Sequence, residues 1–179
     1  MYDVITIGAA TRDVFIKSTA FEVHDGDHPP ESLEGCFPLG SKIEIDDLVA
    51  TTGGGATNAA TTFSRLGFKA TTISAIGNDT LGRVVLEELS NENVSTDLIQ
   101  QLQGEQTAYS VILVAGSAER TILVFRGASQ KIDPKKVPWG KLKTKWFYIS
   151  SLGGHAELLT AALAHADGHG IAPGGRGTG

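Results

Sequence analysis

The sequence predicts an α/β protein in which helices cover both faces of a parallel β-sheet. Short β-branched runs have the composition of buried strands and lie at residues 4–7, 70–76 and 145–150. Segments with helical spacing of apolar residues alternate with them and lie at residues 59–66, 81–89 and 158–163. This alternation of strands and helices is typical of a parallel sheet buried between helices.

The first fifty residues add extended segments to this pattern. Gly8 ends the first strand, residues 8–13 have the composition of a turn, and an extended pattern resumes at residues 14–16. Residues 22–38 are acidic and rich in proline, histidine and glycine, so we expect an exposed loop there. Residues 41–48 alternate loosely between apolar and polar side chains and predict a strand that leads into a glycine-rich motif.

The middle of the chain predicts a helix and then a β-hairpin. Thr80 can cap the helix that follows the turn at residues 77–79. Residues 107–114 and 121–125 alternate like strands, and the short connection between them predicts a hairpin. Asp133 begins a further turn region before the last core strand.

The hairpin interrupts the alternation of strands and helices, and this predicts a small accessory sheet beside the main one. Its strands are expected within residues 14–21, 41–49 and 107–126 of a domain that spans residues 1–170. Open α/β sheets bind ligands beyond the carboxyl ends of their strands. We therefore expect Gly8, Gly77 and Ser150 at the ligand-binding edge, together with the glycine-rich motif.

Composition and charge exclude several classes of protein. The 179 residues carry a net charge of −5 and no basic run, so nucleic acid and anionic membranes are poor partners. The apolar runs are too short to cross a bilayer, and the N-terminus lacks the features of a signal peptide. A single cysteine, Cys36, excludes an internal disulfide framework. Together these features predict a cytoplasmic protein.

The C-terminal end is unusually rich in glycine. Six of the 22 glycines fall within residues 168–179, which contain almost nothing to bury. We therefore expect residues 171–179 to form a disordered tail or the abnormal, truncated end of a longer chain.

Three consecutive glycines begin the most informative segment, which runs from Gly53 to Asn58. Without Cβ atoms, its backbone N–H groups can contact a small polar ligand, and the N-terminus of the following helix supplies further donors. The Asn58 amide can both donate and accept hydrogen bonds, as a sugar hydroxyl requires. The alternative interpretation is an ordinary glycine-rich turn before a helix.

The order and spacing of the motifs resemble the N-terminal half of PfkB-family, ribokinase-like carbohydrate kinases over residues 2–167. The matching pieces are the first strand and turn, the Gly-Gly-x-x-x-Asn core, the Leu-Gly that ends its helix and a Gly-x-Asp-x-x-Gly, at residues 4–13, 53–58, 66–67 and 77–82. The resemblance implies transfer of the ATP γ-phosphate to a hydroxyl of a sugar or nucleoside. It also implies a ribokinase-like three-layer sandwich with a small β-sheet lid over the sugar.

By this resemblance, four residues of the chain bind the substrate. Asp13 would accept hydrogen bonds from sugar hydroxyls, because an ionised carboxylate is an acceptor-only group. Gly54 and Gly55 would bring the backbone to the sugar, and the Asn58 side chain would bind a hydroxyl. The alternatives are a solvated turn carboxylate for Asp13 and an N-terminal helix cap or turn residue for Asn58.

Other polar residues carry different expectations. We expect Asp79 to be a structural turn and capping residue, although the family keeps an acidic residue there. Arg126 either ends an exposed strand or meets an anionic group of a substrate. The histidines show no metal-ligand pattern, and we interpret them all as surface residues: His24, His28, His155, His165 and His169.

The second signature of the family, a C-terminal Gly-Ala-Gly-Asp run, is absent from the sequence. In the family, this run supplies the catalytic base and an anion hole at a helix N-terminus. The resemblance implies ATP and Mg²⁺ as cofactors, but it assigns no catalytic, nucleotide-binding or metal-binding residue in this chain. We therefore expect the chain to carry the sugar-binding half and to be inactive alone.

Of two other functional interpretations of the sequence, one stays open. A non-catalytic module that binds a sugar or a protein partner could derive from such a kinase. A dinucleotide-binding domain is disfavoured, because residues 8–13 lack the Gly-x-Gly-x-x-Gly fingerprint. A half-length parallel sheet would also expose an edge strand and an apolar face, which predicts marginal stability and self-association, with a homodimer through the lid as one form.

Overall fold

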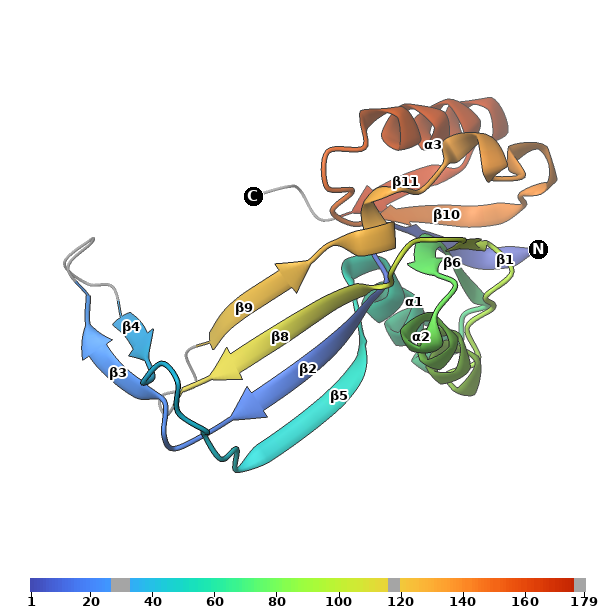
Figure 1. Ribbon diagram of the computed structural model, residues 1–179. Coiled ribbons are helices and arrows are strands. Elements are labelled where there is room, and N and C mark those ends of the chain that lie inside the picture. The colour runs from blue at the N-terminus through green and yellow to red at the C-terminus, as the bar shows by residue number, and fades with distance from the viewer. Residues whose placement is uncertain (27–32, 116–119, 176–179) are drawn as a thin grey trace. The chain divides into compact units, whose positions relative to one another are not determined.

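The computed structural model describes residues 1–26, 33–115 and 120–175, and the chain folds into two compact units (Figure 1). Unit 1 contains Met1–Arg12, Thr52–Tyr109 and Phe125–Gly179, and unit 2 contains Asp13–Thr51 and Ser110–Val124. The chain therefore passes between the two units four times.

Unit 1 is built on a parallel sheet of five strands in the order β11-β10-β1-β6-β7. The strands are β1 (Tyr2–Ile7), β6 (Ala70–Gly77), β7 (Ile99–Leu102), β10 (Thr144–Ile149) and β11 (Ala172–Gly175). Ile5, in the central strand, lies opposite Thr71 on one side and Phe147 on the other, and each neighbouring pair is parallel. This confirms the parallel sheet that the sequence predicts.

Helices cover both faces of this sheet. They are α1 (Gly55–Arg65), α2 (Thr80–Asn91) and α3 (Ala156–His169) (Figure 1). Alternate side chains of a strand point to opposite faces, so β1 contributes to two cores. Ile5 and Ile7 belong to the core that contains Leu158 of α3, whereas Val4 belongs to the core that contains Ala60 of α1 and residues of α2. The result is a three-layer α/β architecture.

Unit 2 is formed by two small sheets. The larger has the order β5-β2-β8-β9. Its strands are β2 (Thr11–Lys17), β5 (Asp47–Gly53), β8 (Ala108–Val114) and β9 (Arg120–Phe125). One or two residues at one end of each of these strands are assigned to unit 1. The smaller is an antiparallel pair of β3 (Glu22–Asp25) and β4 (Leu33–Cys36), in which Val23 lies opposite Gly35. The two predicted hairpin strands are confirmed, and residues 116–119 of their connection lie outside the described residues.

Two predictions about unit 2 are wrong. Residues 22–38 contain β3 and β4 rather than only a loop, because pairing satisfies the backbone groups of strands whose side chains are exposed. The strand expected at residues 41–48 lies later, in β5. The Asp46 N–H donates to the Lys17 carbonyl, and its carboxylate accepts from the Thr19 N–H, so side-chain and loop contacts replace strand pairing in the segment before β5.

In unit 1, the expected capping role of Asp79 is confirmed, and Thr80 is not the cap of α2. The extended backbone of Asp79 lets its carboxylate accept from the Gly82 N–H at 2.7 Å. The short strand β7 was not predicted, since four residues are too few to show a period. Residues 172–175 of the predicted tail form β11 beside β10, and residues 176–179 lie outside the described residues.

Within the described residues, β11 is an edge strand of the sheet in unit 1. The sequence predicted that a half-length sheet would have such an unpaired edge. Pro173 lies in this strand, and proline is tolerated at an edge because it has no N–H to donate. Trp146, on the neighbouring β10, is exposed to about half of its surface. The self-association that this exposed apolar area predicts stays a prediction.

Candidate functional site

The glycine-rich motif connects β5 to α1 in a turn that lies close to other backbone. Gly54 has a φ of +104°, which residues with side chains rarely adopt, and a Cβ atom there would overlap the carbonyl group of Ala9. A Cβ atom on Gly55 would overlap the hydroxyl of Ser150. The fold itself therefore requires glycine at position 54, whereas a side chain at position 55 would require only the Ser150 side chain to shift.

Two buried threonines hold this motif in place. The Thr6 hydroxyl donates to the Ala56 carbonyl at 2.8 Å, and the Thr57 hydroxyl contacts the carbonyls of Gly53 and Gly54. Both threonines are buried, so these bonds replace the water that each hydroxyl loses on folding. No pattern in the sequence indicates this role, because threonine also occurs on exposed strands and helices.

A cavity of about 390 Å³ opens beside α1. Its lining comes from α1 and from the carboxyl end of β10, and consists of Gly55, Asn58, Ala59, Thr62, Phe63, Tyr148 and Ser150. Asn58 and Thr62 are four residues apart and therefore share one side of the helix. The lining in the described residues combines amide and hydroxyl groups with two aromatic rings and contains no charged side chain. This chemistry suits a neutral, polyhydroxylated molecule.

The predicted residues of unit 1 lie together at this cavity. Gly55 and Asn58 line it, and Gly54 is the N-cap of α1. Asn58 lies inside α1 with its side chain exposed, so the alternative in which Asn58 caps the helix is wrong. A Cβ atom on Gly8 would lie 3.2 Å from Cβ of Ser150, which confirms that these two residues meet at the carboxyl edge of the sheet.

The fourth predicted residue, Asp13, belongs to unit 2, whereas Gly54, Gly55 and Asn58 belong to unit 1. It lies within β2 and is half-buried. The turn predicted for residues 8–13 therefore ends earlier, and the alternative of a turn carboxylate is wrong. A shared substrate contact of Asp13 and Asn58 stays a prediction.

Asp79 is a structural residue, as predicted. Its carboxylate accepts hydrogen bonds from the Gly82 N–H at 2.7 Å and from the hydroxyl and N–H of Thr107 at 2.6 and 2.8 Å. Burial raises the pKa of this carboxyl, but the bonds from Thr107 and Gly82 outweigh it and hold the pKa below the usual value. The Gly-x-Asp-x-x-Gly motif thus ties the start of α2 to the start of β8.

Arg126 is exposed at the end of β9, as its structural interpretation expects. His165, in contrast, is not a surface residue. It is only 8% exposed, and its ring lies 5.7 Å from that of Trp139 and 5.9 Å from that of Phe147. Burial, followed by the neighbouring His169, lowers the pKa of His165.

Two classes of site find no support in the part of the chain that the structure describes. No three histidine, cysteine or acidic side chains there come close enough together to hold a metal ion. None of the helices described there has the length and apolar character that crossing a membrane requires.

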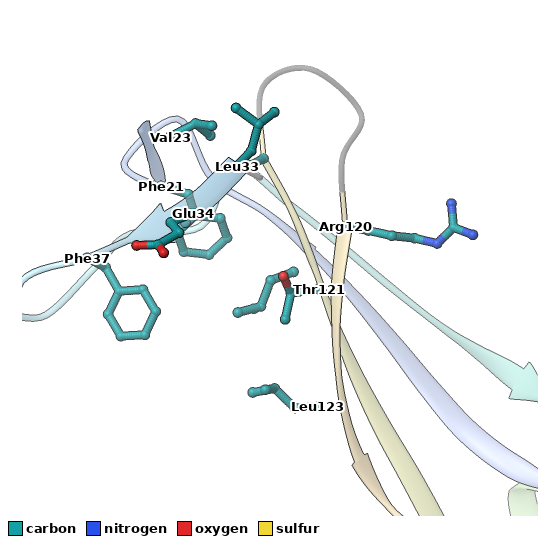
Figure 2. A pocket seen from close by; sticks show the side chains of 11 residues that line it. Phe21, Val23, Leu33, Glu34, Phe37, Arg120, Thr121 and Leu123 are labelled. Carbon is teal, nitrogen blue, oxygen red and sulfur yellow. The ribbon is translucent and has the colours of Figure 1, made fainter. Parts of the chain in front are cut away.

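A second cavity, of about 430 Å³, lies within unit 2 (Figure 2). Aromatic and aliphatic side chains from the β3–β4 region and from β9 dominate its lining, among them Phe21, Leu33, Phe37 and Leu123. The Arg120 side chain points away from the other labelled residues in Figure 2. Because few polar groups converge on it, this cavity suits a polyhydroxylated ligand less well than the cavity beside α1.

Comparison with known proteins places these features in a family. Residues 4–170 match the profile described as pfkB family carbohydrate kinase. The ribokinase of Haemophilus influenzae is 34% identical over 81 residues, which cover 45% of this chain and 26% of that protein. The ribokinase of Schizosaccharomyces pombe is 27% identical over 134 residues, covering 72% of this chain and 42% of that protein.

Solved structures share the fold. The Arabidopsis thaliana ribokinase complexed with ribose and ATP superimposes with a TM-score of 0.73 at 15% identity, over 96% of this chain and 52% of that one. The architecture of unit 1 and the attached sheets is therefore ribokinase-like. The chain spans about half of the length of this relative, and it matches a smaller share of the two ribokinases above.

Proposed function

The chain belongs to the pfkB family of carbohydrate kinases, and we propose that it carries the sugar-binding half of an enzyme that phosphorylates a sugar hydroxyl with ATP. The observation that supports this most is the neutral cavity lined by Gly55, Asn58 and Ser150. It lies where the carboxyl ends of parallel strands meet the N-terminus of a helix, the usual ligand position in open α/β sheets.

In this proposal, Asn58 is the main unit 1 contact to the substrate. Its amide donates one hydrogen bond and accepts another, which matches two neighbouring hydroxyls of a sugar ring. Thr62 and Ser150 supply hydroxyls of their own, and Tyr148 and Phe63 bound the cavity with aromatic rings. We assign Gly54 and Gly55 to the backbone that lies closest to the sugar.

We propose that Asp13, from β2, completes the sugar contacts. A carboxylate accepts hydrogen bonds only, so it complements the donors of two hydroxyl groups. The support is its place in the chain, directly after the first strand and turn of the family pattern, and its half-buried position.

We propose ATP with Mg²⁺ as the cofactor, because a structural relative is complexed with ribose and ATP. Phosphoryl transfer depends mainly on positioning and on stabilising charge. The sequence contains no Gly-Ala-Gly-Asp run that could supply a base and an anion hole. Residues 1–179 alone should therefore bind sugar without phosphorylating it.

We further propose a cytoplasmic location for the protein.

We also propose that the chain associates with itself through unit 2. β9 is exposed along its whole length and contains three consecutive apolar residues, Ile122, Leu123 and Val124. An exposed apolar strand at the edge of a sheet readily pairs with another chain. A second copy of unit 2 is the partner that this edge would accept.

Calorimetric titration of the purified chain with ribose, fructose and adenosine tests the sugar site. We expect one of them to bind, and Asn58→Ala to weaken that binding about tenfold or more, which corresponds to about 1.4 kcal/mol. Asn91→Ala is the matched control, because Asn91 is exposed at the end of α2 and does not line the cavity. Binding that Asn58→Ala leaves unchanged would contradict the proposed site.

A second measurement separates the two functional interpretations. If residues 1–179 belong to a kinase, a chain in which they are joined to the C-terminal half of a pfkB-family kinase should phosphorylate the bound sugar. Sugar binding without any ATP turnover in that extended chain would favour the non-catalytic sugar-binding module.

A further inference from the structure

Glu88, on α2, contacts two chain segments that are distant in sequence. Its Oε1 atom pairs with Arg12 Nη1 at 2.5 Å. Its Oε2 atom accepts from both the N–H and the hydroxyl of Thr52, each at 2.7 Å. One carboxylate therefore joins α2 to the start of β2 and to β5.

This contact is more than an exposed ion pair. The Arg12 side chain is only 12% exposed and that of Glu88 is 36% exposed, so water screens the pair less than it screens a surface salt bridge. Burial raises the pKa of Glu88, but the bonds from Thr52 and Arg12 together hold it below the usual value. The carboxylate is therefore ionised at neutral pH.

The two partners of Glu88 occupy special places in the chain. Arg12 is the last residue of unit 1 before the chain enters unit 2, and Thr52 is the first residue after the chain returns. Asp13 follows Arg12 directly, and the glycine-rich motif begins one residue after Thr52. Both segments that carry the predicted sugar contacts thus start from residues that Glu88 holds.

We propose that Glu88 is a positioning residue for sugar binding, which fixes the starting points of the Asp13 segment and of the glycine-rich motif. This inference rests on the proposed function, because it assumes that Asp13 and Asn58 bind one sugar. Glu88 itself does not line the cavity beside α1 and acts through Arg12 and Thr52. Nothing in the sequence pattern singles it out from Glu87, its neighbour.

The Glu88→Gln variant tests the role with little change in shape. The amide keeps one acceptor oxygen but loses the charge that pairs with Arg12, so we expect sugar affinity to fall about tenfold in calorimetric titration. Glu87→Gln is the matched control, since Glu87 is exposed on the same helix and the change removes the same charge. The control should stay within about twofold of the wild type.

A double-mutant cycle distinguishes positioning from a general loss of stability. Arg12→Gln should weaken sugar binding as Glu88→Gln does, and the double variant should lose no more than either single variant. Losses that simply multiply would contradict a shared role for the pair.

Hydrogen exchange supplies a readout that does not need a sugar. In Glu88→Gln, the amides of residues 11–17 and 47–55 should exchange faster, while those of α3 (Ala156–His169) stay unchanged. If the wild type binds no sugar, the proposed function fails, whereas exchange still tests the contact. Faster exchange with unchanged sugar affinity would overturn the positioning role, and unchanged exchange would overturn the contact itself.

Discussion

The strands β6 in unit 1 and β9 in unit 2 contradict a simple reading of hydrophobicity. Every residue of β6 is buried, although the strand contains Thr71, Thr72 and Ser74. Every residue of β9 is exposed, although the strand reads Arg-Thr-Ile-Leu-Val-Phe. The difference shows that burial depends on which elements cover a strand, because helices of unit 1 pack against β6, whereas the part of unit 2 that the structure describes contains strands and no helix.

Hydrogen bonds make the burial of polar residues in β6 possible. The Thr71 hydroxyl donates to the Ser95 carbonyl at 2.8 Å, Ser74 donates to the Gly8 carbonyl at 2.7 Å, and the hydroxyls of Thr72 and Ser74 lie 2.9 Å apart. The three buried hydroxyls of β6 therefore each have a hydrogen-bond partner. Unit 2 exposes the apolar side chains of β9 and is the part of the chain suited to contacts with a protein partner.

The largest effect should separate two leucines. Leu158, in α3, is fully buried, and Leu123, in β9, is 55% exposed. We expect Leu158→Ala to lower the free energy of unfolding by about 2–5 kcal/mol and Leu123→Ala by less than about 0.5 kcal/mol. Urea denaturation followed by circular dichroism measures both, and equal losses would show that β9 is buried in solution.

The second largest effect concerns glycines at positive φ. Gly54→Ala places a Cβ atom against the backbone of Ala9, and Gly67→Ala places one in open space at a similar φ of +87°. We expect the first change to cost about 2–4 kcal/mol and the second about 1 kcal/mol, because only the first adds a steric overlap to the strain. The urea midpoints measure this difference, and an equal cost for both would rule out the close approach to Ala9.

A smaller difference in stability is expected when each of two serines that make the same kind of hydrogen bond is replaced. Ser74 is buried and donates to the Gly8 carbonyl, and Ser41 of unit 2 is exposed and donates to the Pro38 carbonyl, each at 2.7 Å. Ser74→Ala should cost about 1–2 kcal/mol, because it leaves a buried acceptor with fewer partners, and Ser41→Ala should cost close to nothing. A loss of similar size at both positions in thermal melts would contradict this assignment of burial.

The smallest effect is a pH dependence of unit 1. The pKa values of His165, Asp79 and Glu88 are all lowered, and all three residues lie in unit 1. Each therefore stabilises the fold at a pH above its usual pKa, which is 6.5 for His165, 4.5 for Glu88 and 3.8 for Asp79. This stability is lost as the pH falls below that usual value and through the lowered pKa of the folded protein. Acid should loosen unit 1 before unit 2.

Two fluorescent probes can follow the units separately. Both tryptophans lie in unit 1, and the single cysteine, Cys36, is exposed in β4 of unit 2. Tryptophan emission should change at a higher pH than the anisotropy of a dye attached to Cys36. His165→Gln should remove the part of the change in tryptophan emission that occurs at the highest pH. A change of both probes at the same pH would show that the two units respond together.

The sequence predicted the parts of the fold that have a long, regular period. The buried strands and three helices of unit 1 fall close to their expected positions, because short β-branched runs such as residues 70–76 are typical of strands in a parallel sheet. The β3–β4 pair escaped prediction, since its polar side chains resemble those of a loop and only the pairing reveals it. Asp79 and Thr80 were both expected as capping residues at the start of α2, and the extended backbone of Asp79 decides between them.

The candidate site was predicted in part. The meeting of Gly55, Asn58 and Ser150 follows from the rule that the carboxyl ends of parallel strands share an edge. Tyr148 and Thr62 could not be inferred, because their contribution depends on how α1 packs against β10, although Thr62 lies one helical turn after Asn58 and this spacing is a usable signal. Glu88 gave no signal, since its partners are 36 and 76 residues away.

The repeated passage of the chain between the two units affects how the protein comes apart. Unit 2 is supplied by two separate stretches of chain, and the neighbouring strands β2 and β8 join those stretches in one sheet. A protease that cuts any single connection leaves both fragments held by strand pairing, so a nicked molecule should still run as one species on a native gel. For the same reason, neither unit can be excised as one continuous piece.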